Sequence, residues 1–103
     1  MTLEQVGDRL KSTGLPTAYN AFPPGTAPAL PFLCYRFTNG NNLHADGRVY
    51  YSGSSIEAEL LTPVKDPAVE QKVETALNGI HWEKSETYIE SQNCFRILYE
   101  IEV

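Results

Sequence analysis

The last ten residues, CFRILYEIEV at positions 94–103, decide the fold class. Phe95, Ile97, Tyr99, Ile101 and Val103 alternate with a second set that includes Arg96, Glu100 and Glu102. An apolar residue at every second position is typical of a β-strand that buries one face and exposes the other to water. The sequence therefore predicts a sheet with one core face, for which the rest of the chain must supply further strands and a covering layer.

Extended segments with strand-like composition recur along the chain. They are predicted at residues 17–22, 32–39, 42–45, 48–52, 56–62, 80–84 and 86–89. Three turn signals separate them. Asn39-Gly40 predicts a turn, Asp46-Gly47 predicts a tight hairpin because both residue types tolerate positive φ, and Gly53 predicts a break or bulge.

Two helices flank the central strands. Thr2 and Gln5 form a capping-box pattern at the start of a helix over residues 2–13. Asp66 and Pro67 fit the N-cap and the first position of a second helix, which Asn78-Gly79 ends. Each helix has a narrow apolar stripe, so each is expected to rest on the sheet.

The order of elements is helix, strands, helix, strands, with tight turns and no visible domain linker. This order predicts one α+β domain over residues 1–103, a two-layer fold in which an antiparallel sheet carries two helices packed on one face. The other face of the sheet should be solvated or meet something polar. It would hold Glu57, Glu59, Arg96, Glu100 and Glu102.

The charge pattern argues against two classes of partner. The chain has 8 Lys and Arg against 13 Asp and Glu, a formal net charge of −5, and its basic residues are scattered. Nucleic-acid binding draws affinity from clustered cations, and an anionic membrane surface attracts the same clusters. No apolar run approaches the ~18 residues of a membrane span, and no basic, then apolar, secretory leader is visible. We therefore expect no specific nucleic-acid binding and no membrane association.

The chemistry-bearing residues form no recognised catalytic or ligand pattern. His44 and His81 stand far apart, no pair of Cys or His has metal-ligand spacing, and no glycine-rich phosphate loop opens a helix. We expect no catalytic residues, no metal and no cofactor. Cys34 and Cys94 leave an alternative open, a small cytosolic α+β binding module or minor enzyme that uses a cysteine. They can also be reduced, buried apolar residues or bridge neighbouring strands.

The predicted hairpin carries the candidate interaction residues. Tyr50 and Tyr51 are adjacent in a strand, so they should point to opposite faces, which leaves one of them at the surface unless a partner covers it. Exposed Tyr and Arg are typical interface anchors. Asp46, Arg48, Tyr50 and Tyr51 are therefore the predicted partner-binding residues. The competing interpretation is that one tyrosine lies flat over the sheet edge.

Short segments along nearly the whole chain carry a family resemblance. They are residues 14–19 (GLPTAY), 25–28 (GTAP), 30–32 (LPF), 45–50 (ADGRVY), 56–60 (IEAEL), 65–67 (KDP), 86–89 (ETYI) and 99–102 (YEIE). With these segments the chain resembles small proteins encoded among the head–tail morphogenesis genes of long-tailed phages and prophages, most of all their tail-terminator-like group. Connector and completion proteins encoded nearby are similar in size. The segments are turns, caps and strand patterns and include no catalytic signature.

The resemblance implies a structural virion protein. Such a protein would assemble with itself as a ring, a hexamer, on the end of the tail tube, and would join the tube to the head-completion or connector protein. It would be found in the virion, and in the host cytoplasm during assembly. A closed ring needs two different complementary patches on each subunit. We expect the hairpin of residues 41–52 to supply one of them, with Arg48 pairing an acidic neighbour.

Overall fold

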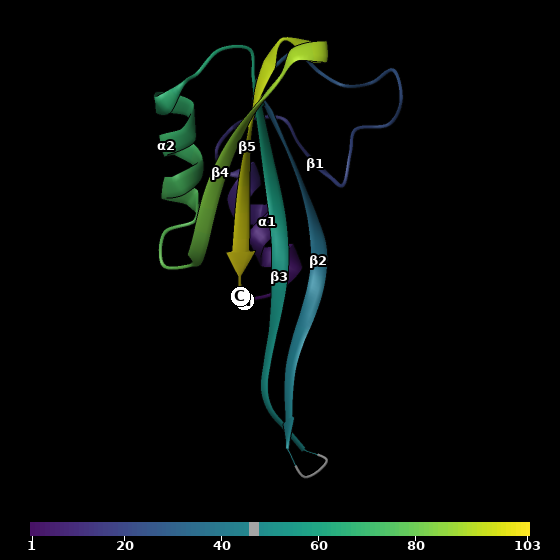
Figure 1. Ribbon diagram of the computed structural model, residues 1–103, viewed down its shortest axis with the longest axis vertical. Helices are drawn as coiled ribbons and strands as arrows, with labels where there is room; N and C mark the ends of the chain where they lie inside the picture. The colour runs from purple at the N-terminus through teal and green to yellow at the C-terminus, as the bar shows by residue number, and fades with distance from the viewer. Residues whose placement is uncertain (46–47) are drawn as a thin grey trace.

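The computed structural model describes residues 1–45 and 48–103, and for residues 39–45 and 48–53 it describes the backbone alone. The elements along the chain are α1 (Leu3–Lys11), β1 (Thr17–Tyr19), β2 (Phe32–Ala45), β3 (Arg48–Thr62), α2 (Pro67–Ala76), β4 (His81–Ile89), the 3₁₀ helix η1 (Glu90–Gln92) and β5 (Cys94–Glu102). The strands form one sheet in the order β1-β2-β3-β5-β4 (Figure 1). The expected two-layer α+β fold is confirmed.

Both helices begin where the sequence predicts. The Thr2 hydroxyl accepts a hydrogen bond from the Gln5 backbone N–H, and the Gln5 side chain accepts one from the Thr2 N–H, which completes the capping box. At α2 the Asp66 carboxylate accepts from the Val69 N–H at 3.3 Å, and Pro67 occupies the first turn. These caps satisfy backbone donors that have no partner within the helix.

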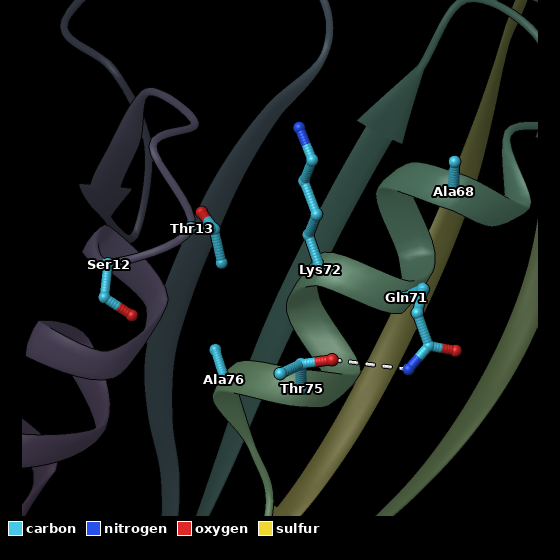
Figure 2. A pocket seen from close by; sticks show the side chains of 7 residues that line it. All are labelled: Ser12, Thr13, Ala68, Gln71, Lys72, Thr75 and Ala76. Carbon is cyan, nitrogen blue, oxygen red and sulfur yellow. Dashed lines mark hydrogen bonds between the residues drawn. The ribbon is translucent and has the colours of Figure 1, made fainter.

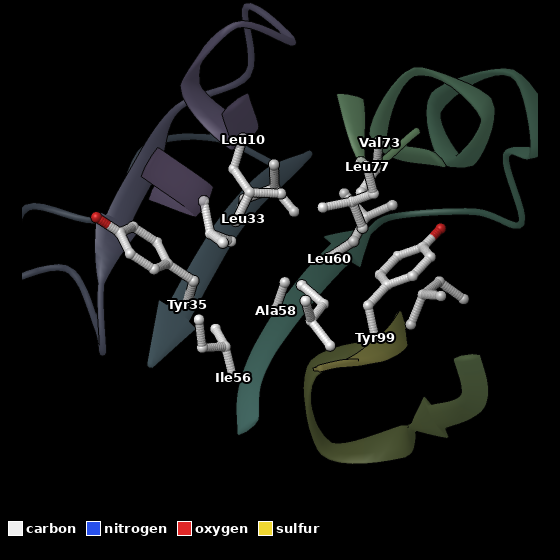
Figure 3. Close-up of a cluster of buried hydrophobic side chains, with 12 residues drawn as sticks. Leu10, Leu33, Tyr35, Ile56, Ala58, Leu60, Val73, Leu77 and Tyr99 are labelled. Carbon is white, nitrogen blue, oxygen red and sulfur yellow. The ribbon is translucent and has the colours of Figure 1, made fainter. Parts of the chain in front are cut away.

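The core lies between the two helices and one face of the sheet (Figure 3). Its buried members are Val6 and Leu10 of α1, Val73 and Leu77 of α2, Leu33 and Tyr35 of β2, Ile56, Ala58 and Leu60 of β3, and Ile97, Tyr99 and Ile101 of β5. Directly paired residues share a sheet face, and the register pairs Leu33 with Leu60 and Leu60 with Ile97. The alternation in residues 94–103 therefore does mark the core face.

Helix α1 approaches the sheet closely at Gly7. A Cβ added to Gly7 of α1 would lie 2.6 Å from Cζ of Tyr35, a distance that real Cβ atoms do not adopt. The absence of a side chain at Gly7 thus lets α1 lie against the Tyr35 ring. Among the described residues no helix is long and apolar enough to span a membrane.

The sheet differs from the prediction in one strand pair. We expected an antiparallel sheet, and three of its four strand pairs are antiparallel, but β1 runs parallel to β2, with Thr17 beside Leu33 and Tyr19 beside Tyr35. The reason is the proline-rich connection of residues 20–31, which returns the chain to the end at which β1 began. A tight turn would have produced an antiparallel pair instead.

Two of the predicted interruptions are wrong. The chain does not turn at Asn39-Gly40, and β3 does not break at Gly53, because β2 and β3 continue past these residues as strands of 14 and 15 residues. Gly40 pairs with Ser54, Asn41 pairs with Gly53, and a register shift follows Phe37. A partner strand was present at each site, so ladder hydrogen bonds outweighed the local turn preference. Likewise Ser85 pairs with Leu98 and joins two predicted segments into the single strand β4.

Candidate functional site

Three of the four predicted interface residues, Arg48, Tyr50 and Tyr51, belong to β3 near its start, at the far end of the β2–β3 hairpin. Asp46 lies outside the described residues. Arg48 pairs with Ala45 and Tyr51 with Leu43, while Tyr50 falls at a register shift between those two pairs. Because such a shift breaks the simple alternation of faces, adjacency alone does not fix opposite directions for Tyr50 and Tyr51. The side chains of Arg48, Tyr50 and Tyr51 are not described, so their interface role stays a prediction.

The hairpin changes character at Ser54. From Ser55 to Thr62, β3 lies between β2 and β5. Its contact with the end of β5 finishes at two backbone hydrogen bonds between Ser54 and Val103, 2.7 and 3.0 Å long. On the side of Ser54 away from β5, residues 39–45 of β2 pair with residues 48–53 of β3, and no other described strand pairs with them. We call these two segments the arm. In Figure 1 the arm extends well past the helices and the other strands.

Past β1, no described strand pairs with the side of β2 that faces away from β3. Tyr19 is the last residue of β1, and its hydroxyl accepts a hydrogen bond from the Phe37 backbone N–H at 3.2 Å. Tyr19 also stands edge-on to the Tyr35 ring, with centroids 5.2 Å apart. Tyr19 is 49% exposed and Phe37 46% exposed. Two partly exposed aromatic rings therefore mark the base of the arm, and no pattern in the sequence indicates that they lie together.

The helix-free face of the sheet holds a row of ion pairs. Nη1 of Arg36 lies 3.1 Å from Glu57 Oε1 and 3.7 Å from Glu59 Oε2, and Nε of Arg96 lies 2.8 Å from the same Glu59 oxygen. Arg36 also donates to the backbone carbonyl of Asn20 at 2.9 Å. We expected this face to be solvated or to meet a polar partner. For Glu57, Glu59 and Arg96 the partners are charged side chains of the same chain.

A second group of charges fastens α2 to β4. Glu70 is 3% exposed, and its carboxylate lies 2.7 Å from Lys65 Nζ and 3.1 Å from Lys84 Nζ. Burial by itself would raise the pKa of Glu70, but the two ammonium groups outweigh it and hold that pKa below its ordinary value. Lys84 also pairs with Glu74 at 2.7 Å. These ion pairs therefore hold α2 against β4 of the sheet.

Tyr99 joins the same cluster from β5. Its hydroxyl donates to Glu74 Oε2 at 2.9 Å while its ring lies fully buried in the core. Burial, followed by the nearby Glu74 carboxylate, raises the pKa of Tyr99 above its ordinary value. The phenol therefore stays protonated at neutral pH and serves as a hydrogen-bond donor.

A groove of about 500 Å³ lies between the end of α1 and α2 (Figure 2). Its lining includes Ser12, Thr13, Lys72 and Thr75, and Gln71 donates a hydrogen bond to the Thr75 hydroxyl at 3.3 Å. These are hydroxyl, amide and ammonium groups, and none of the seven lining side chains is a carboxylate, an imidazole or a thiol. The lining thus offers no general acid–base pair of the usual kind.

The cysteines receive no support as nucleophiles. Cys34 and Cys94 are both free and buried, on β2 and at the start of β5. Burial, with help from the Glu59 carboxylate, raises the pKa of the Cys34 thiol, so little thiolate forms near neutral pH. His81 is exposed on β4, 3.9 Å from Glu83, and the His44 side chain is not described. Among the described residues no cluster of three or more His, Cys, Asp or Glu is placed to hold a metal.

Comparison with known proteins finds a similar fold but no matching family model or curated protein. Among solved structures, the chain is similar to a protein chain in the virion of a native gene transfer agent (GTA) particle. The two share 14% sequence identity and a TM-score of 0.58 over 94% of this chain and 88% of the other. At that identity the likeness is one of fold, and it extends along nearly the whole chain.

Proposed function

We propose that this chain is a structural protein of a phage-like virion that acts where the head meets the tail. The observation that carries the proposal is the shared fold with a virion chain over 94% of the length. Within that setting the sequence resemblance favours a tail terminator, which forms a hexameric ring on the end of the tail tube and presents the surface that joins the head. Its partners are then other copies of itself, the tail tube protein and the head-completion or connector protein. The protein assembles in the host cytoplasm and ends in the virion.

The arm is a feature that favours a protein which assembles with other subunits. A hairpin of two strands without a second layer is marginally stable in water by itself. No other described strand pairs with its outer edges, and proteins usually cover or pair such edges. A neighbouring subunit that receives the arm would satisfy both needs. It would also give each copy the two different patches that a closed ring requires.

The chemistry of the arm fits contact with an acidic surface. Residues 37–53 contain one acidic residue, Asp46, and one arginine, Arg48, so the whole net charge of −5 lies in the rest of the chain. A neutral arm meets an acidic body without like-charge repulsion. We assign the contact to Arg48, Tyr50 and Tyr51 of the arm together with Asp46 of the sequence between its two strands, with Arg48 opposite a carboxylate of the neighbour.

The test is deletion of the coding sequence from the genome that carries it, followed by electron microscopy of the released particles. Overlong tails without heads are expected for a terminator. Tails of normal length that lack heads would instead indicate a connector or completion protein. Normal particles joined to normal tails would contradict a role at this junction. Complementation with the wild-type chain is the control.

A further inference from the structure

The edge of β2 in the arm has a defined starting point. The parallel pair β1–β2 ends where the Tyr19 hydroxyl accepts a hydrogen bond from the Phe37 N–H. Residues 38–45 of β2 continue beyond this point, and no described strand pairs with their side opposite β3. Eight residues of strand span roughly 26 Å at the usual rise. This edge is therefore long enough to receive a strand of ordinary length.

The sheet has a second open edge at its opposite side. β4 (His81–Ile89) is the last strand in the sheet order and pairs, among the described strands, with β5 alone. All of its side chains except Trp82 and Ile89 are exposed. Its nine residues, about 30 Å of strand, match the length of the free β2 edge.

Both edges carry an exposed aromatic residue on the same face of the sheet. Phe37 pairs with Ile56, and Tyr88 pairs with Phe95 on the core side of β5, so both lie on the face that the helices cover. Phe37 is 46% exposed and Tyr88 47% exposed. If the two edges meet so that one sheet continues into the next, these rings come to the same side of the junction, where aromatic pairs add to the stability of the contact.

We propose that the arm of one copy adds its β2 edge to β4 of the next copy, so that the occupant of each edge is a second copy of this chain. The pairing rests on the proposed ring, because a closed ring is what joins two different edges of identical subunits. Main-chain hydrogen bonds supply the affinity in this mode, and the aromatic rings fix the alignment. The neutral arm and the acidic remainder of the chain favour the contact.

The experiment is site-directed cross-linking in assembled particles. One form of the chain carries Asn41→Cys in the arm, and a second form, made heavier by a tag, carries Ser85→Cys in β4. Both are expressed together in cells that lack the natural gene, and purified particles are treated with a short thiol cross-linker. Cys34 and Cys94 are buried, so the unmodified chain is the blank. A matched pair, Asn41→Cys with the exposed Lys72→Cys of α2, tests a surface away from both edges.

The expected product contains one chain of each form, and it should be absent from the matched pair. A product of two arms, or none at all while both forms are present in the particles, overturns the pairing and leaves the proposed function intact. Absence of the wild-type chain from the particles contradicts the proposed function itself, and with it the pairing. The two failures are therefore distinguishable.

A second variant tests the aromatic contact. Phe37→Glu should lower incorporation into particles about tenfold, the effect of losing roughly 1.4 kcal/mol of binding. Val64→Glu is the matched control, because Val64 is 61% exposed and belongs to the connection between β3 and α2, outside both edge strands. Equal incorporation of the two variants, with equal thermal stability, would contradict a role of Phe37 in the junction.

Discussion

The same two strands, β2 and β3, build two regions with different physics. In the body of the molecule, residues 55–62 of β3 lie between β2 and β5, and their apolar face is buried under two helices. In the arm, beyond the Ser54–Val103 hydrogen bonds, the strands have each other and no other described strand. The difference shows that a strand gains stability from its neighbours and its covering layer, and among the described strands each strand of the arm has one neighbour where residues 55–62 have two.

Leu60→Ala should produce the largest effect on the body. Leu60 is fully buried in the core, and removing its side chain leaves a cavity beneath both helices. The free energy of unfolding should fall by about 2–5 kcal/mol in a denaturant titration. Val64→Ala, at a site 61% exposed, should change it by less than about 0.5 kcal/mol. Similar losses for the two variants would contradict the assigned core.

Glu70→Gln should have an intermediate effect. The amide keeps the shape of the side chain but removes the charge that Lys65 and Lys84 face. Loss of one partner of a buried pair is costly, yet both lysines are partly exposed and screened by water. We therefore expect a loss of about 1–2 kcal/mol near neutral pH, measured by denaturant titration.

The pH dependence of that loss tests its electrostatic origin. The pKa of Glu70 lies below its ordinary value in the folded protein, so its contribution is fully present above the unfolded pKa, about 4.3. The contribution is lost as the pH falls through the folded pKa. The gap between wild type and Glu70→Gln should thus be constant from about pH 6 to pH 9, where both lysines stay protonated, and should narrow in acid. A gap that does not change with pH would assign the effect to packing.

Shortening the arm should have the smallest effect on folding. Replacing residues 41–53 by Asn-Gly joins Gly40 to Ser54, which already pair, through a two-residue hairpin turn. The free energy of unfolding should change by no more than about 0.5 kcal/mol, because no residue of the buried core is removed. Incorporation into particles should nevertheless be lost. A large drop in stability would instead make the arm part of the folding unit.

Much of the fold could be predicted from local pattern. The helix caps at Thr2 and Asp66 and the alternation from Phe95 onward are decided by residues close in sequence, and the structure confirms them. The predicted turn at Asn39-Gly40 failed because the preference of two residues is weak against a continuous ladder. The parallel direction of β1 was missed because it depends on the path of a twelve-residue connection, which has no periodic signal.

The candidate surfaces divide in the same way. The sequence pointed to the hairpin and to Arg48, Tyr50 and Tyr51, and the fold carries that hairpin out on the arm. It did not reveal the exposed pair Tyr19 and Phe37, which are eighteen residues apart and meet through a hydrogen bond. Nor did it reveal that Arg36 and Arg96 converge on Glu59.

The sequence by itself determined the two-layer class, the core face and the starts of both helices, because periodicity and capping act over a few residues. The tertiary structure alone decided the strand order, how far β2 and β3 continue beyond the other described strands, and which described strands lie at the edges of the sheet. These depend on contacts between segments far apart in the chain, whose free energies no local pattern records.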